Sequence, residues 1–212
     1  MTRASRLRAL ILAVTVTAAV TLTACGAQAG QASANGPAAG AASAGSTGSG
    51  SPPAAANEFA TVGALAPSGN FAGLDGQSTN VASLRGTPTM LWFIAAGCSS
   101  CTASIPALAE HLTQLKADGV HVEVIDLYDD LGQGPKGAAA LSKLGRQLTG
   151  GSFTDPSWTW GISSRNLSLR YDPSGAPDVY FLLNRTGKIS YENGVPVSTM
   201  TQLLANARAA AA

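Results

Sequence analysis

The sequence has few of the side chains that bind charged partners or metal ions. Only 12% of its 212 residues are Asp, Glu, Lys or Arg, the formal net charge is +1, and the charges form neither a basic stripe nor an acidic tail. Binding to a nucleic acid therefore has no electrostatic support, because that affinity depends on clustered Lys and Arg. Histidine occurs only twice, at His111 and His121, and cysteine three times.

Residues 1–57 lack almost all of the aromatic and charged side chains. They contain three arginines and an apolar run, followed by almost nothing but Ala, Gly, Ser, Gln and Pro. The rest of the chain, roughly 155 residues, is long enough to bury the core of one domain.

The start of the chain is typical of an export signal. The arginines precede an apolar stretch over residues 9–22, which is too short to span a bilayer comfortably. The stretch ends in Leu22-Thr23-Ala24-Cys25, which is similar to the bacterial lipobox, whose cysteine becomes the lipidated N-terminus. We therefore expect a signal peptide over residues 1–24 and a lipid on Cys25, which anchors the protein at the extracytoplasmic face of the cell membrane. The alternative is an ordinary signal peptide with a cysteine nearby.

Residues 25–57 are expected to form a flexible tether that begins at the lipidated cysteine. The segment is of low complexity and shows no apolar periodicity. A flexible chain of this length has a reach on the order of 30 Å. No second apolar segment approaches a spanning length, so residues 58–212 are expected to form a soluble domain held near the membrane.

Two predicted strands flank a predicted helix in the first half of this domain. Thr89–Ala95 is a continuous apolar run, typical of a strand buried on both faces. Apolar residues then recur at helical spacing from Ser99 until Asp118-Gly119, and Val120–Leu127 is the second strand. Such a unit places its two strands parallel, with a right-handed crossover.

The sequence pattern in the second half of the domain predicts two further helices, a β-hairpin and a C-terminal helix. We assign helices to Ala138–Leu148 and Ser157–Leu169, hairpin strands to Val179–Leu183 and Lys188–Glu192, and a final helix capped by Ser198. These elements favour an α/β fold in which helices flank a central mixed sheet.

Cys98 and Cys101 lie at the junction between the first predicted strand and its helix, separated by two serines. By itself this spacing is compatible with a redox pair, half of a zinc site or a structural bridge. Zinc would need two more ligands, but His111 is about 15 Å further along the helix and His121 opens the next strand. A bridge would close too small a loop to stabilise the fold much.

A redox pair is therefore the favoured interpretation. Cys98 would be the nucleophile, because the amides at a helix start stabilise a thiolate. Cys101, one turn further and less exposed, would resolve the mixed disulfide. If Cys25 carries lipid, the other two cysteines can pair only with each other, which an oxidising compartment permits.

Three segments resemble exported thioredoxin-like thiol-disulfide oxidoreductases of the TlpA/ResA-like family. They are Leu84–Cys101, the proline-containing helix segment Ile105–Leu108, and Gly175–Ile189. The resemblance implies a thioredoxin-like fold and a redox-active disulfide without a dissociable cofactor. It also implies a cis Ala176-Pro177 bond opposite the disulfide, where the Ala176 backbone pairs with an extended substrate.

The resemblance further implies exported protein thiols or disulfides as partners, together with an electron donor or acceptor. It suggests a reductant in the maturation of cytochromes or metalloproteins, and an oxidant or isomerase is the alternative direction. A thioredoxin-fold lipoprotein that binds copper or a partner protein without turnover is the alternative from another class, since Cu(I) suits two thiolates.

The chain departs from this family at three places. Gly97 stands where an aromatic residue is usual, and serines fill the pair of positions between the cysteines, where a proline is usual. Many relatives also have a buried acid near the second cysteine, and the matching positions here are Ser104 and Trp92. Among the carboxylates of the second predicted strand, Glu123 is a candidate buried proton acceptor.

Overall fold

One mixed seven-stranded sheet forms the centre of the computed structural model, which describes residues 59–132 and 136–212. The predicted signal peptide, the tether and Cys25 lie outside the described residues. The strands are β1 (Asn70–Gly73), β2 (Ser78–Asn80), β3 (Thr89–Ile94), β4 (His121–Asp126), β5 (Trp158–Ser163), β6 (Val179–Leu183) and β7 (Ile189–Gly194). Within the described ranges, no helix has the length and apolar character needed to cross a membrane.

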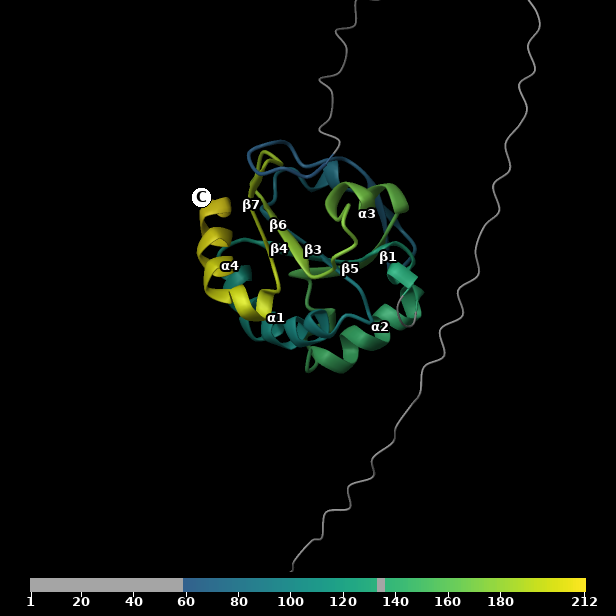
Figure 1. Cartoon of the computed structure of the whole chain (residues 1–212). Helices are drawn as coiled ribbons and strands as arrows, with labels where there is room; N and C mark the ends of the chain where they lie inside the picture. Colours follow the sequence, from purple (N-terminus) through teal and green to yellow (C-terminus); the bar gives the residue numbers. More distant parts are fainter. Residues whose placement is uncertain (1–58, 133–135) are drawn as a thin grey trace, which may run out of the picture. The chain divides into compact units, whose positions relative to one another are not determined.

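Helices cover both faces of this sheet, whose strand order is β2-β1-β5-β4-β3-β6-β7. In Figure 1, α1, α2 and α4 lie on one side of the sheet and α3 lies on the other. The helices are α1 (Ser99–Ala117), α2 (Gly137–Leu148), α3 (Arg165–Tyr171) and α4 (Pro196–Ala211), with short 3-10 turns η1 (Val81–Leu84), η2 (Tyr128–Gly132) and η3 (Ser152–Thr154). The predicted mixed sheet with flanking helices is confirmed.

The predicted βαβ unit is also confirmed. Every residue of β3 is buried, because helices pack on both faces of the sheet at this strand. Successive β3 side chains enter different cores: Trp92 packs on the side of α1, α2 and α4, and Phe93 on the side of α3. β4 runs parallel to β3, and Ile94 at the end of β3 is paired with Asp126. The sheet therefore delivers the end of β3 directly to the start of α1.

The prediction of a helix over Ser157–Leu169 is wrong in its first half. Trp158–Ser163 is the strand β5, parallel to β4 and antiparallel to β1, and only Arg165–Tyr171 is helical. Trp158 and Trp160 alternate along the strand and are both buried, so a period of two was present in the sequence. Gly161 allows close packing here, since a Cβ at this position would lie 2.8 Å from the Phe71 ring.

The start of the last helix also differs from the prediction. Helix α4 begins at Pro196, two residues before Ser198, and Val195 precedes it with a left-handed backbone at φ 50°. Proline suits the first position of a helix because its φ is already helical and its missing N–H would have no intrahelical partner. Ser198 therefore lies inside the first turn, and the N-cap Val195 makes no side-chain hydrogen bond.

Candidate active site

A disulfide joins Cys98 and Cys101 where β3 passes into α1. Cys98 is the N-cap of α1, and its Sγ accepts a hydrogen bond of 3.1 Å from the backbone N–H of Cys101. Cys98 is partly exposed, whereas Cys101 is completely buried. This difference in exposure is the one expected from the sequence, and the roles of the two sulfurs in exchange stay predictions.

The loop before the disulfide is held by a buried carboxylate. The Ala96 N–H donates a hydrogen bond to Asp130 Oδ1, and the Cys98 N–H bonds to the Ala95 carbonyl at 3.0 Å. Asp130 lies in η2, where Asp129, Asp130 and Leu131 have left-handed backbones. Burial raises the pKa of the nearby Asp126 from 3.8 to about 8, and the Asp130 carboxyl adds to this effect.

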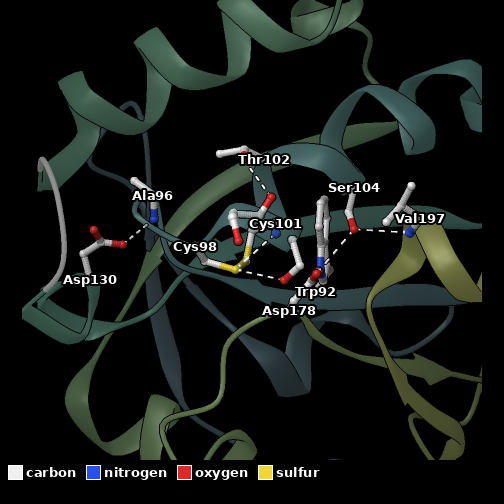
Figure 2. Close-up of a disulfide and its surroundings, with 11 residues drawn as sticks. Trp92, Ala96, Cys98, Cys101, Thr102, Ser104, Asp130, Asp178 and Val197 are labelled. Atoms are coloured by element: carbon white, nitrogen blue, oxygen red, sulfur yellow. Dashed lines mark hydrogen bonds between the residues drawn. A yellow bond between two sulfur atoms is a disulfide. The ribbon is translucent and has the colours of Figure 1, made fainter. Parts of the chain in front are cut away.

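A second buried carboxylate lies beside the sulfur atoms. Asp178 directly precedes β6 and is 1% exposed. One of its carboxylate oxygens and the Sγ atoms of Cys98 and Cys101 all lie within 4.8 Å of one another. Figure 2 shows Asp178 below the disulfide, next to Trp92 and Ser104. Asp178 is not among the site residues predicted from the sequence.

The two positions where relatives carry an acid hold donors to Asp178 in this chain. Trp92 Nε1 donates a hydrogen bond of 2.9 Å to Asp178 Oδ1, and Ser104 Oγ donates one of 3.4 Å to Oδ2. Ser104 Oγ in turn accepts a hydrogen bond from the Val197 N–H at 3.2 Å. The side chains at these two positions supply no acid, as expected. A carboxylate reaches the same place from Asp178, which directly precedes β6, the neighbour of β3 on the side away from β4.

Burial raises the pKa of Asp178 above its ordinary value, because the charged form loses its hydration. Hydrogen bonds from Ser100, Trp92 and Ser104 act in the opposite direction and offset part of that shift. The Ser100 hydroxyl also lies 3.2 Å from Cys98 Sγ. Ser100 therefore lies against the partly exposed sulfur, on the same side of the site as the buried carboxylate.

The backbone of Asp178 is fixed in an unusual conformation. Its φ is 79°, in the left-handed region that few residues other than glycine adopt. The Asp178 N–H donates to the Phe93 carbonyl at 2.8 Å, and the Asp178 carbonyl accepts from the Val195 N–H at 2.7 Å. Strained backbone that its surroundings hold in this way is found mainly at functional sites.

Ala176 and Pro177 directly precede Asp178, so the structure brings this segment close to the disulfide. Ala176 is exposed and Pro177 is partly buried. The Ala176 N–H donates to Asp172 Oδ1 at 2.8 Å, so this amide is not free for a substrate strand, contrary to our expectation. The cis bond and the role in substrate positioning stay predictions.

The other candidates from the sequence do not join the cysteines. Glu123 lies early in β4, where it accepts a hydrogen bond from Thr159 and lies 3.3 Å from His121. His121 is paired with Thr89 at the opposite end of β3 from the disulfide. Across the described ranges, Cys98, Cys101 and Asp178 form the single cluster of three side chains suited to hold a metal ion.

Comparisons with known proteins identify the family and the fold of this chain. The family model described as Redoxin matches residues 61–210, and no curated protein matches the chain. Among solved structures, a proposed thiol:disulfide interchange protein DsbE from Chlorobium tepidum is 20% identical with a TM-score of 0.56, and the alignment covers 72% of this chain and 99% of that chain.

Two further structures show the same fold. BsSco, a member of the Sco family of cytochrome c oxidase assembly proteins, is 17% identical with a TM-score of 0.53, over 69% of this chain and 93% of its own. A thiol:disulfide interchange protein from Bacteroides sp. is 18% identical with a TM-score of 0.52, over 69% and 91%. At these identities the likeness establishes the fold, and the predicted thioredoxin-like fold is confirmed.

Proposed function

Since the chain belongs to the Redoxin family, we propose that it is a thiol-disulfide oxidoreductase that exchanges disulfides with exported proteins. The observation that carries this proposal is the Cys98–Cys101 disulfide at the start of α1, with one sulfur partly exposed and the other buried. A partner can reach Cys98, and Cys101 lies ready to displace it.

In the reducing direction, the Cys98 thiolate attacks a partner disulfide. An S–S bond forms between Cys98 and one partner sulfur, and the other partner sulfur leaves as a thiolate. Cys101 then attacks Cys98 Sγ, so that the Cys98–Cys101 bond forms and the second partner sulfur leaves. The partner gains two electrons and the cysteine pair loses two, with no dissociable cofactor. Oxidation of a partner dithiol is the same sequence in reverse.

The proposed location is the extracytoplasmic face of the cell membrane, with Cys25 lipidated and residues 26–57 acting as a tether. The export-like start of the chain supports this location. Substrates in that compartment would include cytochrome or metalloprotein cysteines, and the chain would need a separate electron donor to reduce them. An oxidant or isomerase role is the alternative direction, and the reduction potential of the pair in a glutathione buffer distinguishes the two.

The activity is tested by insulin reduction with dithiothreitol as the electron source. We expect the wild-type domain to accelerate the reaction and Cys98→Ser to abolish the acceleration. Cys101→Ser, reduced and then freed of dithiothreitol, should instead accumulate a mixed disulfide on Cys98 when insulin is added, visible by mass spectrometry. Wild-type protein that is no faster than Cys98→Ser would refute the enzyme proposal.

A second candidate function is copper binding without turnover, because reduction would leave two thiols beside a buried carboxylate. Cu(I) prefers the two soft thiolates, whereas the harder Asp178 oxygen is a poor ligand for it. Stoichiometric Cu(I) binding by the reduced domain, together with no exchange activity, would favour this function over the first.

A further inference from the structure

We propose that Asp130 is a positioning residue for Cys98, on which it acts by fixing the loop over residues 95–97. The loop ends at Cys98, the N-cap of α1, where backbone N–H groups without helical partners favour a thiolate. The inference rests on the proposed exchange activity and deepens it, because it assigns the reactivity of the attacking sulfur to a carboxylate of η2, a different part of the chain.

The loop over residues 95–97 is anchored from outside at its middle residue. Ala95 is buried directly after β3, but Gly97 is exposed and has no side chain with which to hold the loop in place. Between them, the Ala96 N–H donates a hydrogen bond to Asp130 Oδ1 (Figure 2). A bond to an ionised acceptor is stronger than one between neutral groups. Asp130 therefore limits the movement of the residues that carry Cys98.

The fold fixes Asp130 itself. Its side chain is buried, and its N–H donates to the Leu127 carbonyl at 2.9 Å. The turn that carries it is bonded to α3, because the Tyr128 N–H donates to Ser168 Oγ at 2.8 Å. Three consecutive residues of this turn have a left-handed backbone, which costs free energy for any residue with a side chain. Such a turn persists only where its surroundings hold it, so the position of Asp130 is imposed by the fold.

A protonated neighbour lets Asp130 act as a charged acceptor within the core. Asp126 is buried, and burial together with the Asp130 carboxyl raises its pKa from 3.8 to about 8, so that Asp126 is mostly neutral at neutral pH. Two ionised carboxylates side by side would repel each other, and none of the ion pairs in the described ranges includes either group. The proton on Asp126 removes that repulsion and leaves Asp130 to accept the Ala96 N–H.

The charge of Asp130 and its hydrogen bond to the loop would change the pKa of Cys98 in opposite directions. Loss of a nearby negative charge favours the thiolate and lowers the pKa of a thiol. Loss of the anchor lets the sulfur leave the helix N-terminus, which raises that pKa. Cys101 and Asp178, which offer ligand atoms within 4.8 Å of Cys98 Sγ, also influence its ionisation, so the test variants keep both. The direction of the change therefore separates positioning from a direct effect of charge.

The pKa of Cys98 is measured on the reduced, purified full chain from the pH dependence of its alkylation by iodoacetamide. Mass spectrometry quantifies the modified Cys98 peptide. Asp130→Gly removes the carboxylate, and glycine adopts a left-handed backbone without strain. We expect the pKa of Cys98 to rise by about 1 in this variant, since a helix N-terminus lowers the pKa of a thiol by at least about that much. The thiolate fraction at a pH below both values then falls about tenfold.

Two matched variants show whether the bond to Ala96 is responsible. Asp130→Asn keeps an oxygen that can accept the Ala96 N–H, and asparagine tolerates a left-handed backbone. It should therefore return the pKa of Cys98 to the wild-type value or below it. Asp129→Gly removes the neighbouring acid of the same turn, which is exposed and lies 2.6 Å from Lys136 Nζ. It should leave the pKa of Cys98 unchanged.

Hydrogen exchange provides a check that needs no variant. In the reduced wild-type chain, the Ala96 amide should exchange with solvent more slowly than an exposed amide, because its hydrogen is bonded to Asp130. An Ala96 amide without this protection would refute the role of Asp130, whether or not Asp130→Gly folds.

The remaining outcomes distinguish this proposal from the exchange function. A pKa of Cys98 that is unchanged or lower in Asp130→Gly, an equal rise in Asp129→Gly, or no recovery in Asp130→Asn would each refute the role of Asp130. Wild-type protein that fails to reduce insulin would refute the exchange function, whereas the effect of Asp130 on the ionisation of Cys98 would still be measured by alkylation.

Discussion

The indole N–H of Trp92 donates a hydrogen bond of 2.9 Å to Asp178, although the two residues are 86 positions apart in the chain. Trp92 lies in β3 and Asp178 directly precedes β6, which runs antiparallel to β3. This bond holds the carboxylate under the disulfide (Figure 2).

Removing this donor should destabilise the fold. In Trp92→Phe the aromatic ring remains but the buried carboxylate loses a partner, so we expect unfolding free energy to fall by about 1–3 kcal/mol beyond the loss of volume. Trp160→Phe is the matched control, because Trp160 Nε1 is buried with no hydrogen-bond partner in the described part of the chain. Urea denaturation of both variants measures the difference. Equal losses would show that the Trp92–Asp178 bond adds nothing.

Stability should fall as the pH rises toward the alkaline range. Asp126 has a folded pKa of about 8 against an ordinary value of 3.8, so the folded state holds a proton that the unfolded state has lost. By linkage, the unfolding free energy declines between these two values as pH rises. Asp126→Asn removes this dependence on pH. The unfolding free energy of the variant minus that of wild type should therefore be larger at pH 9 than at pH 5, by at least about 1 kcal/mol. Parallel stability curves would contradict this prediction.

Gly161→Ala should destabilise the domain without affecting the disulfide chemistry. The new Cβ would lie 2.8 Å from the Phe71 ring and 2.9 Å from the Ala72 carbonyl oxygen, where β1 packs on β5. Overpacking of this kind costs about 1–3 kcal/mol. Thermal unfolding measures the loss, and insulin reduction below the melting transition should match wild type. A variant as stable as wild type would mean that the ring moves aside freely.

The lipid anchor is tested on the full chain expressed in a bacterium. Cys25→Ser should move the protein from the membrane fraction to the soluble extracytoplasmic fraction, because the cysteine is the proposed lipid attachment site. Mass spectrometry of the wild-type N-terminus should show a diacylglyceryl group on Cys25. Wild-type protein in the soluble fraction, or a Cys25→Ser variant that stays in the membrane fraction, would refute the lipid anchor.

The elements around the disulfide could be predicted from sequence because their signals are local. The apolar run of β3, the helical spacing in α1 and the turn between β6 and β7 each lie within a short window. The strand β5 is not distinguished from a helix by its local pattern, because only Ser164 separates it from α3 and the two elements together have the length of one helix. Burial of Trp158 and Trp160 on one face decides for the strand.

Asp178 could not be identified in the same way, because its role depends on contacts across the sheet. The positions where relatives carry a buried acid hold Trp92 and Ser104 in this chain, and the predicted candidate, Glu123, lies at the other end of the sheet from the disulfide. A local signal was available: Asp178 follows Pro177 and precedes five residues of apolar or aromatic character, Val179–Leu183.

Ala176 and Pro177, which are predicted to face the substrate, are followed at once by Asp178, the buried carboxylate beside the disulfide. The predicted recognition residues and the carboxylate beside the disulfide thus share one short peptide segment, in which bonds to Phe93 and Val195 hold Asp178. A mutation that broadened or narrowed the range of partners here would also displace the carboxylate. With Ala176 and Pro177 in their predicted role, partner choice and the surroundings of the disulfide would be constrained together during evolution, and an engineer who wishes to retarget the protein would change the rim of the site and leave these three residues alone.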